Sequence, residues 1–317
     1  MTNKKVVAFG GGGLAEVVLP ALKKLDISVT TITSMTDSGG STGALRREFG
    51  VHPAGDLREH MLGLSEAEQW KLDLWKFRFA NDLVFDDNHK GHNFANVFMA
   101  GIEKSTGDFE KVLEIAHKFM EVKGSCYPAT MEKIQLYAEL ANGDIIKGED
   151  EIDVPRPGRD TTIPIKKIWL EPEATAYDKT LDAVKKADYI LIGPGDLYSS
   201  LLPCFLPKGI KESVSKSKAK IIYICNLLAK SGESYKFTAS DHVKKVLEYI
   251  GRDRAEYLIV APMKIGEDYL VANPDIRNYS PVKIDIGELE KNVIETIQMN
   301  PTDIEELSKT LSKIINR

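Results

Sequence analysis

The chain has 317 residues, of which 43% are hydrophobic and 28% charged, and its formal net charge is -5. These values predict one large globular unit, and they exclude a protein that is attracted as a whole to nucleic acid or to an anionic membrane. No apolar run approaches the roughly 20 residues that span a bilayer, and the first apolar stretch is too short for a signal-peptide core. Cys126, Cys204 and Cys225 are widely spaced, which predicts reduced, buried thiols. We expect a cytoplasmic homo-oligomer that binds neither nucleic acid nor membrane.

The first half of the chain predicts the start of a parallel sheet. Residues 5–9 (KVVAF) and 28–33 (SVTTIT) are typical of strands, and apolar residues recur at helical spacing between them. A helical pattern covers residues 56–80. Two more helices are expected over residues 93–121, separated near Gly107, with Asp108 as an N-cap.

A hairpin interrupts this α/β pattern. Asn142-Gly143 lies between two apolar runs at 134–140 and 145–146, which is a strong hairpin signal. Residues 147–163 are rich in charge, Pro and Gly and are expected to form a loop. We therefore expect an inserted hairpin subdomain at approximately residues 120–165 of a single Rossmann-like domain spanning residues 1–317.

The α/β pattern then resumes. Strands are expected at residues 164–170, 189–192 (YILI), 219–225 (AKIIYIC) and 256–260, and helices at residues 176–187, 208–217, 240–250 and 302–315, the last capped by Thr302 or Asp303. The fold class predicted is α/β, a Rossmann-like, mostly parallel sheet flanked by helices, with the inserted β-hairpin.

Polar segments, most of them rich in glycine, follow four of the predicted strands. They are residues 10–13, residues 36–43, residues 193–200 and the segment from Asn226 onward. In a parallel sheet all such segments emerge at one edge, where open α/β folds bind their ligands. We therefore predict that this edge binds a phosphate-bearing ligand of the nucleotide type.

The first two segments suit an anion. Gly10, Gly11, Gly12 and Gly13 open a helix, so their amides can face a phosphate, although a tight structural turn is the alternative. They form neither a dinucleotide fingerprint nor a Gly-Lys-Ser/Thr phosphate loop. The second segment combines glycines and hydroxyls around one carboxylate, as an anion nest requires, and Arg46 and Arg47 follow; a flexible surface loop is the alternative. Its expected ligand contacts are Ser38, Gly39, Gly40, Ser41, Thr42 and Arg46.

Further residues complete the predicted site. Asp56 is a candidate helix cap; alternatively Asp37 and Asp56 hold a divalent cation such as Mg²⁺ or act as an acid/base pair. His89 and His92 do not share a helix face because Gly91 lies between them, so Asn93 is expected to cap a helix or contact the ligand.

The third segment, residues 193–200, forms a rigid turn or a ligand contact, with Tyr198 stacking on a ring or donating to a phosphate. Its contacts are Gly193, Pro194, Gly195, Asp196, Leu197 and Tyr198, and Arg58, Asn93, Asn96 and Asn226 add to them.

Taken together, the segments resemble the gluconeogenesis-factor (YvcK-like) family, a relative of the 2-phospho-L-lactate transferases (CofD-like). The segments that carry this resemblance are AFGGGG, TDSGGSTGALRREFGVHPAGDLREHMLGLS, GHNFANVFMAGI, AELANGDIIKGE, LIGPGDLYSSLLPCFLPKGI and YICNLLAKSGESYKFTASDHV.

The resemblance implies a Rossmann-like core and one of two activities. In the gluconeogenesis-factor branch it implies binding of a nucleotide sugar, UDP-N-acetylglucosamine, with roles in growth on gluconeogenic carbon and in cell shape. In the transferase branch it implies transfer of a phospholactyl group from a guanosine diphosphate carrier to a deazaflavin precursor, with acidic residues matching Asp37 and Asp56 associated with magnesium.

Three readings follow. A binding or regulatory protein is favoured by GGSTGALRREFG and GPGDLYSS, which match the gluconeogenesis-factor branch more closely. A Mg²⁺-dependent transferase is the alternative. A structural or interaction protein is the third, and the clustering of glycine-rich turns at one predicted edge argues against it.

Overall fold

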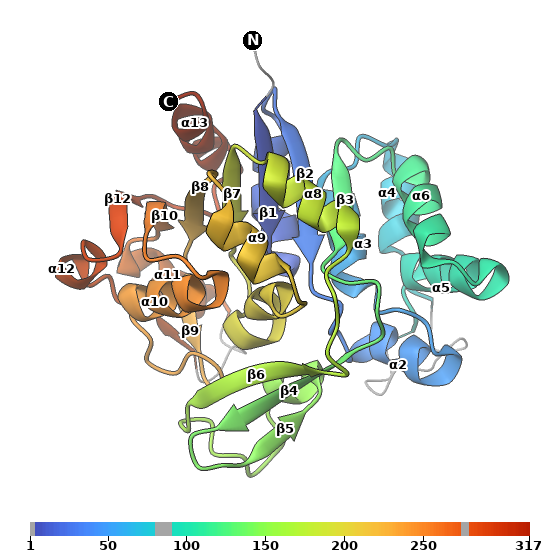
Figure 1. The fold of residues 1–317 in the computed structure, drawn as a ribbon, viewed down its shortest axis with the longest axis horizontal. Helices are drawn as coiled ribbons and strands as arrows, with labels where there is room; N and C mark the ends of the chain where they lie inside the picture. The colour runs from blue at the N-terminus through green and yellow to red at the C-terminus, as the bar shows by residue number, and fades with distance from the viewer. Residues whose placement is uncertain (1–3, 80–90, 274–278) are drawn as a thin grey trace.

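The structure, a computed structural model, describes residues 4–79, 91–273 and 279–317. Its centre is a parallel sheet of seven strands in the order β12-β10-β8-β7-β1-β2-β3 (Figure 1). The strands are β1 (Lys5–Phe9), β2 (Ser28–Thr33), β3 (Ser125–Pro128), β7 (Tyr189–Ile192), β8 (Lys220–Ile224), β10 (Ala255–Val260) and β12 (Val293–Gln298). All neighbours pair in parallel, which confirms the predicted α/β class. The strand order reverses between β1 and β7.

Helices flank the sheet in two groups and form a lobe beside β3. Helices α8 (Asp178–Lys186), α9 (Ile210–Lys216) and α10 (Ala239–Ile250) contact one another in chain order. The π-helical turn η1 (Leu14–Val18), α1 (Leu19–Lys23), α3 (Gly55–Gly63) and α13 (Ile304–Ile315) form the second group. The lobe consists of α2 (Gly40–Phe49), α4 (Gln69–Lys76), α5 (Phe94–Thr106) and α6 (Phe109–Phe119).

Local sequence signals explain where several helices begin. Asp108 accepts from the Glu110 amide, which confirms it as the N-cap of α6, and Asp303 likewise caps α13. Asn93 caps α5 by accepting from the Asn96 amide. The helix expected over residues 56–80 is instead two helices, α3 and α4. The chain leaves the helical path between them, where the Ser65 hydroxyl donates to the Met120 carbonyl.

The inserted hairpin is part of a separate three-stranded antiparallel sheet. It consists of β4 (Gln135–Leu140), β5 (Ile145–Lys147) and β6 (Ile165–Glu171), in the order β5-β4-β6. The strand expected at 164–170 therefore extends the hairpin rather than joining the main sheet. The expected loop at 147–163 contains a short helix, α7 (Glu149–Asp153). The small sheet lies beyond the carboxyl ends of the parallel strands, at the end of the molecule away from both termini (Figure 1).

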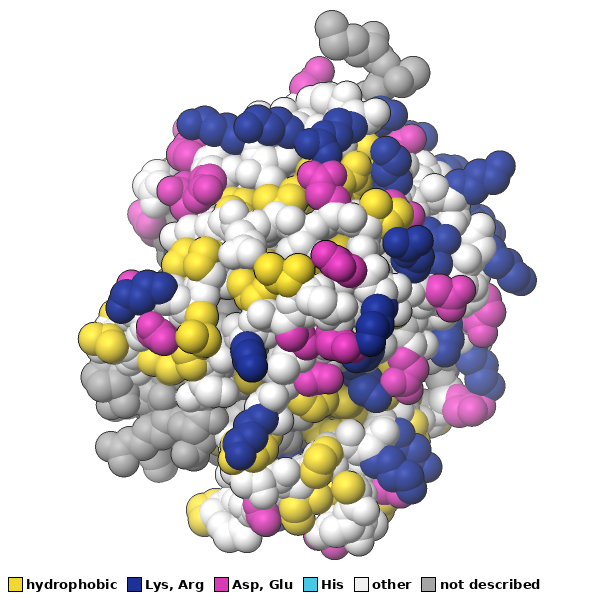
Figure 2. Space-filling view, turned by 90° about the vertical axis from the view of Figure 1, so that its left-hand side faces the viewer, with side chains coloured by type: hydrophobic (Ala, Val, Ile, Leu, Met, Phe, Trp, Pro, Cys, Tyr) yellow, Lys and Arg dark blue, Asp and Glu magenta, His cyan; other side chains and the backbone are white. Residues whose placement is uncertain are grey.

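Other elements were not predicted. They are β3, β12, the two-stranded pair β9 (Leu228–Lys230) and β11 (Tyr279–Pro281), helices α2, α11 (Met263–Ala272) and α12 (Ile286–Leu289), and the short turns η3 (Leu197–Leu201) and η4 (Leu202–Phe205). All three cysteines are free and buried, as expected. Across the described ranges, no helix has both the length and the apolar character needed to cross a membrane. On the face shown in Figure 2, acidic and basic side chains are intermixed.

Candidate functional site

The polar turns after β1, β7 and β8 pack against one another at the carboxyl edge of the sheet. A Cβ atom at Gly195 would stand 3.4 Å from the amide nitrogen of Gly11, and one at Gly13 would stand 3.6 Å from the carbonyl oxygen of Pro194. The Asn226 side chain braces the same place, since it accepts from the Gly195 amide at 3.2 Å and donates to the Gly195 carbonyl at 2.9 Å. Turns that are far apart in sequence therefore form one surface.

The glycines after β1 differ in what surrounds them. A Cβ at Gly11 would lie 2.8 Å from the Ser200 Cβ and 3.3 Å from a carboxylate oxygen of Asp56, so close packing excludes a side chain there. Nothing lies within 4 Å of the equivalent position at Gly12, which is exposed. Because Gly12 and Gly13 begin the helical path that continues into η1, their amides lack intrahelical partners and suit an anion.

The turn after β2 holds the Asp37 carboxylate against the start of α3. Asp37 accepts from the Gly39 amide at 3.0 Å, and a Cβ at Gly55 would stand 2.2 Å from its second carboxylate oxygen. Only a glycine at position 55 lets the helix approach so closely. Burial raises the pKa of Asp37, against the lowering effects of the Gly39 amide and the Thr42 hydroxyl.

Asp37, Asp56 and Glu149, which we call the Asp37 cluster, bring three carboxyl groups together. Asp56 is the second residue of α3 and does not cap it. Burial, and then the charge of Asp37, raise the pKa of Asp56 to about 8. Burial, and then the charge of Asp37, raise the pKa of Glu149, on α7, to about 10. At neutral pH Asp56 and Glu149 therefore retain their protons unless a cation is near.

Helix α7 is docked on the Asp37 turn by a small hydrogen-bonded contact. Ser38 donates from its hydroxyl to Asp150 at 2.5 Å and accepts from the Asp150 amide at 3.1 Å. The Ser38 amide donates to Glu149 at 3.4 Å. The inserted segment therefore contributes the Glu149 carboxyl group to the site. The loop predicted for residues 147–163 gives no indication of this contribution.

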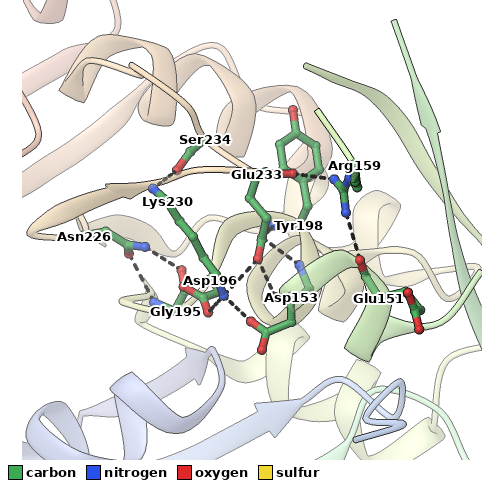
Figure 3. Close-up of polar contacts among 12 residues, drawn as sticks. Glu151, Asp153, Arg159, Gly195, Asp196, Tyr198, Asn226, Lys230, Glu233 and Ser234 are labelled. Atoms are coloured by element: carbon green, nitrogen blue, oxygen red, sulfur yellow. Dashed lines mark hydrogen bonds and ion pairs between the residues drawn. The ribbon is translucent and has the colours of Figure 1, made fainter. Parts of the chain in front are cut away.

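A second group of carboxylates surrounds one lysine (Figure 3). Lys230 pairs with Asp153 and, at 2.7 Å, with Asp196, and its ammonium lies 3.5 Å from Glu233. We call these four residues the Lys230 cluster. The carboxylates raise the pKa of Lys230 against the opposing effect of burial, so it stays charged. The three carboxylates have the spacing of a metal site, but Lys230 already supplies the cation.

Glu233 also fixes the start of η3. Its carboxylate is fully buried and accepts from the amides of Tyr198 at 2.7 Å and Ser199 at 3.1 Å and from the Ser199 hydroxyl at 3.0 Å. Burial, and then the charge of Asp196, raise the pKa of Glu233 to about 7. The amides of Tyr198 and Ser199 and the Ser199 hydroxyl therefore donate to this carboxylate within the protein.

A cleft of about 460 Å³ opens where the β1 and β7 turns meet, and we call it the switch-point cleft. Its floor includes Gly12, Gly13 and Gly195, and one wall comes from the segment after β8. Two tyrosines, Tyr269 and Tyr279, add aromatic surface. The remaining described lining consists of Glu16, Val17, Pro194, Asp196, Ser200, Cys225, Asn226, Leu227, Leu228, Pro301 and Thr302.

Several residues expected to contact the ligand have hydrogen-bond partners within the protein. The Arg46 guanidinium donates to the carbonyls of Thr36, Asp37 and Ile134. Asn93 caps α5 and donates to the Trp75 and Phe77 carbonyls. Leu197 and Tyr198 lie in the core, and the Tyr198 hydroxyl donates to the Ile165 carbonyl, so that ring is not placed to stack on a ligand.

The remaining expected contacts lie around the Asp37 turn. Ser41 pairs with His92 at 2.9 Å, and Thr42 accepts from Asn96 at 3.2 Å. The Asn96 side-chain oxygen is buried without a hydrogen-bond partner among the described residues. Gly40 begins α2 with a positive φ of 43°. His89, the other histidine of the pair considered in the sequence analysis, lies outside the described residues.

Sequence reasoning missed Glu149, Asp153, Lys230, Glu233, Tyr269 and Tyr279. The acidic run EDEID and the motif AKSGES carry the first four, but nothing local indicates that they converge. Tyr269 and Tyr279 lie in a stretch of the sequence without strong hydrophobic periodicity, so no local pattern indicates them. Lys230 and Glu233 could have been suspected only from the position of AKSGES, which follows Asn226 at the sheet edge where a ligand is expected.

Comparison with known proteins agrees with this architecture. The profile described as 2-phospho-L-lactate transferase CofD matches residues 6–302. A gluconeogenesis factor of Halalkalibacterium halodurans is 36% identical over 94% of this chain and 89% of its own length. The gluconeogenesis factor of Bacillus subtilis is 35% identical over 93% of this chain and 90% of its own.

Solved structures show the same fold. The X-ray structure of a Bacillus halodurans protein superposes with a TM-score of 0.87 at 32% identity, covering 98% of this chain and 100% of the other. A crystal structure of a member of the UPF0052 family from Bacillus halodurans gives a TM-score of 0.86 at 33% identity with the same coverage.

Proposed function

Since the chain belongs to the CofD family and is similar to gluconeogenesis factors over more than nine-tenths of its length, we propose that it binds a nucleoside diphosphate in the switch-point cleft. We propose a UDP-sugar as the ligand, and a role of the gluconeogenesis-factor kind in carbon metabolism and in the cell envelope or cell shape. The protein would act in the cytoplasm, as a homo-oligomer.

The observation that carries the proposal is the position of the cleft. It lies between β1 and β7, where the strand order reverses, and crevices at such switch points are where open α/β sheets bind nucleotides. Gly12 and Gly13, at the helix start, suit the diphosphate. Tyr269, on α11, offers a surface on which a base can stack.

The charge of the cleft shapes the proposal further. Its described lining includes Glu16 and Asp196 and no Lys or Arg. A diphosphate would therefore be held by main-chain amides, and a divalent cation would offset the repulsion from the nearby carboxylates. Asp37 and Asp56 offer the oxygen ligands that Mg²⁺ prefers, and the cation would neutralise charge on the diphosphate.

Calorimetric titration with UDP, a UDP-sugar and GDP, with and without Mg²⁺, tests the proposal. Tyr269→Ala should weaken binding of the preferred nucleotide about tenfold, which is typical for the loss of one base-stacking contact. Tyr235→Ala is the matched control, because Tyr235 is similarly exposed but lies outside the described lining of the cleft. The proposal is abandoned if the folded protein binds none of the nucleotides.

A Mg²⁺-dependent transferase is the second candidate, and the Asp37 cluster favours it. In that reaction an acceptor hydroxyl forms a bond to the phosphorus of the phospholactyl group, the bond to the bridging oxygen breaks, and the nucleoside monophosphate leaves. Asp37 and Asp56 would hold the Mg²⁺, and Asp56 would take the hydroxyl proton only in its charged form, which a bound cation favours against the pKa raised to about 8. Incubation with a guanosine-diphosphate-linked phospholactyl donor should release the monophosphate, and Asp37→Asn should abolish this turnover without unfolding the protein. Full turnover by Asp37→Asn would remove the assignment.

A further inference from the structure

A second cleft, of about 610 Å³, opens on the other side of Gly12, and we call it the basic cleft. It shares Gly12 and Glu16 with the switch-point cleft. Its walls come from η1, α1, α3 and α4 and from the residues that flank α5. The remaining described lining consists of Ala15, Pro20, Lys23, Arg58, Glu59, Leu62, Gly63, Leu72, Lys76, Arg78 and Asn93.

The two clefts differ in charge. The described lining of the basic cleft has four cationic side chains, Lys23, Arg58, Lys76 and Arg78, and two carboxylates, Glu16 and Glu59. An excess of cations in a concave surface attracts anions, because the low-dielectric walls focus the field. The basic cleft can therefore hold an anion with charged side chains. The switch-point cleft can hold one only with main-chain amides or an added cation.

Arg58 is the most buried cation of the basic cleft, and its guanidinium is only partly paired. The residue is 9% exposed, its Nη2 pairs with Glu59, and its Nε is buried without an acceptor in the described part of the chain. A buried donor that lacks an acceptor costs free energy, and a guanidinium offers its donors in a fork that matches phosphate. The Arg58 carbonyl accepts from the buried Trp75 indole at 3.0 Å, which fixes the backbone beneath this side chain.

The other cations are held at the walls and keep free N–H groups. Lys23 donates one hydrogen bond to the Ser65 carbonyl at 2.6 Å, and an ammonium has three donors. Arg78 donates to the Gly91 carbonyl at 3.3 Å and has four further donors. Gly12 adds the amide of a helix start.

We infer that the basic cleft binds the phosphate group of a second small molecule, separate from the nucleotide. The excess of two positive charges in the described lining matches a phosphate monoester dianion, and the volume leaves room for the body of a small metabolite. The site adds a second ligand to the proposed function, and its four cationic side chains lie outside the described lining of the switch-point cleft.

Titration with inorganic phosphate, followed by calorimetry, tests the inference. The variant carries Lys76→Gln and Arg78→Gln, since both side chains are exposed and their removal does not threaten the fold. The control carries Lys218→Gln and Lys313→Gln, two exposed cations outside the described lining. Wild type should bind phosphate saturably, the variant at least about tenfold more weakly, and the control like wild type.

Titration with UDP, on the same proteins, separates this inference from the proposed function. UDP affinity should be equal in all three proteins, and saturation with UDP should leave phosphate affinity unchanged. The inference is overturned if phosphate does not saturate, if variant and control weaken alike, or if UDP displaces phosphate. Phosphate binding without UDP binding would instead remove the proposed function and leave this site standing.

Discussion

Two groups of three carboxylates stand side by side at the carboxyl edge of the sheet, and they differ in what balances them. In the Lys230 cluster, one ammonium contacts all three carboxylates. In the Asp37 cluster, none of the three groups forms an ion pair among the described residues, and burial raises the pKa of each. The difference teaches that the first cluster has its counter-charge in direct contact, whereas Arg46 and Arg58 act on the second without an ion pair and leave the pKa of its carboxyl groups raised.

Lys230→Met should produce the largest effect. Methionine keeps the apolar stem but removes the ammonium, which leaves the buried Glu233 and the half-buried Asp153 and Asp196 without a counter-charge. Breaking a buried ion pair in this way typically costs about 3–5 kcal/mol. Denaturant unfolding of wild type and variant measures the loss. Lys313→Met, at an exposed site, should change stability by less than about 0.5 kcal/mol. Equal stability of Lys230→Met and wild type would contradict the structural role.

Asp56→Asn should act in the opposite direction. Asparagine resembles the protonated carboxyl that the raised pKa favours, and it removes repulsion from Asp37. We expect the variant to be about 1–2 kcal/mol more stable than wild type at pH 9, since one unit of pKa shift corresponds to about 1.4 kcal/mol. Denaturant midpoints at pH 9 give the sign. A loss of stability would show that the Asp37 cluster is balanced by contacts like those of Lys230.

Stability should fall as pH rises through the neutral range. The folded protein keeps protons on Asp56 up to about pH 8 and on Glu149 up to about pH 10, whereas unfolded carboxyls release them near pH 4. The folded state therefore binds more protons in this window, and the free energy of unfolding declines by on the order of 1 kcal/mol per pH unit. Lys230 adds no slope here, because its stabilisation is lost only above its unfolded pKa near 10.5.

Unfolding curves at pH 5, 6, 7 and 8 check this slope. Asp56→Asn should flatten it between pH 5 and 8, because that variant has no proton to lose at position 56. A stability that rises over the same range would mean that the carboxylates of the Asp37 cluster are stabilised in their charged form.

Asn226→Ala should destabilise the protein by about as much as Asp56→Asn stabilises it. It removes the two hydrogen bonds that brace Gly195, each contributing about 1 kcal/mol, so we expect a loss of about 1–2 kcal/mol. UDP binding should weaken severalfold because the Gly195 turn lines the switch-point cleft. Asn316→Ala, which removes one exposed local hydrogen bond, is the control. Unchanged UDP binding would separate this turn from the ligand.

The sequence predicts the fold well where the signal is local. The buried strand YILI, the Asn-Gly hairpin and the caps Asn93, Asp108 and Asp303 all stand where their patterns indicate. The strand β12 was missed because its residues are mostly half-exposed and give no continuous apolar run. Helix α7 was missed because EDEID has no helical apolar period and is held by the tertiary contact between Ser38 and Asp150.

The candidate site divides in the same way. The meeting of the glycine-rich turns could be predicted because parallel strands bring their ends to one edge. The hydrogen-bond partners of Arg46 and Tyr198 could not be predicted. Their side chains donate to the carbonyls of Ile134 and Ile165, which come from distant segments of the chain. The convergence of Asp153 and Glu233 on Lys230 could not be predicted from the sequence either, because Asp153 comes from a segment distant from Lys230.

A crystal structure with a bound UDP-sugar and Mg²⁺ tests the central claim most directly. The account predicts the diphosphate against Gly12, Gly13 and Gly195, with the cation on the side of Asp37 and Asp56. A nucleotide bound at any other place on the molecule would contradict it.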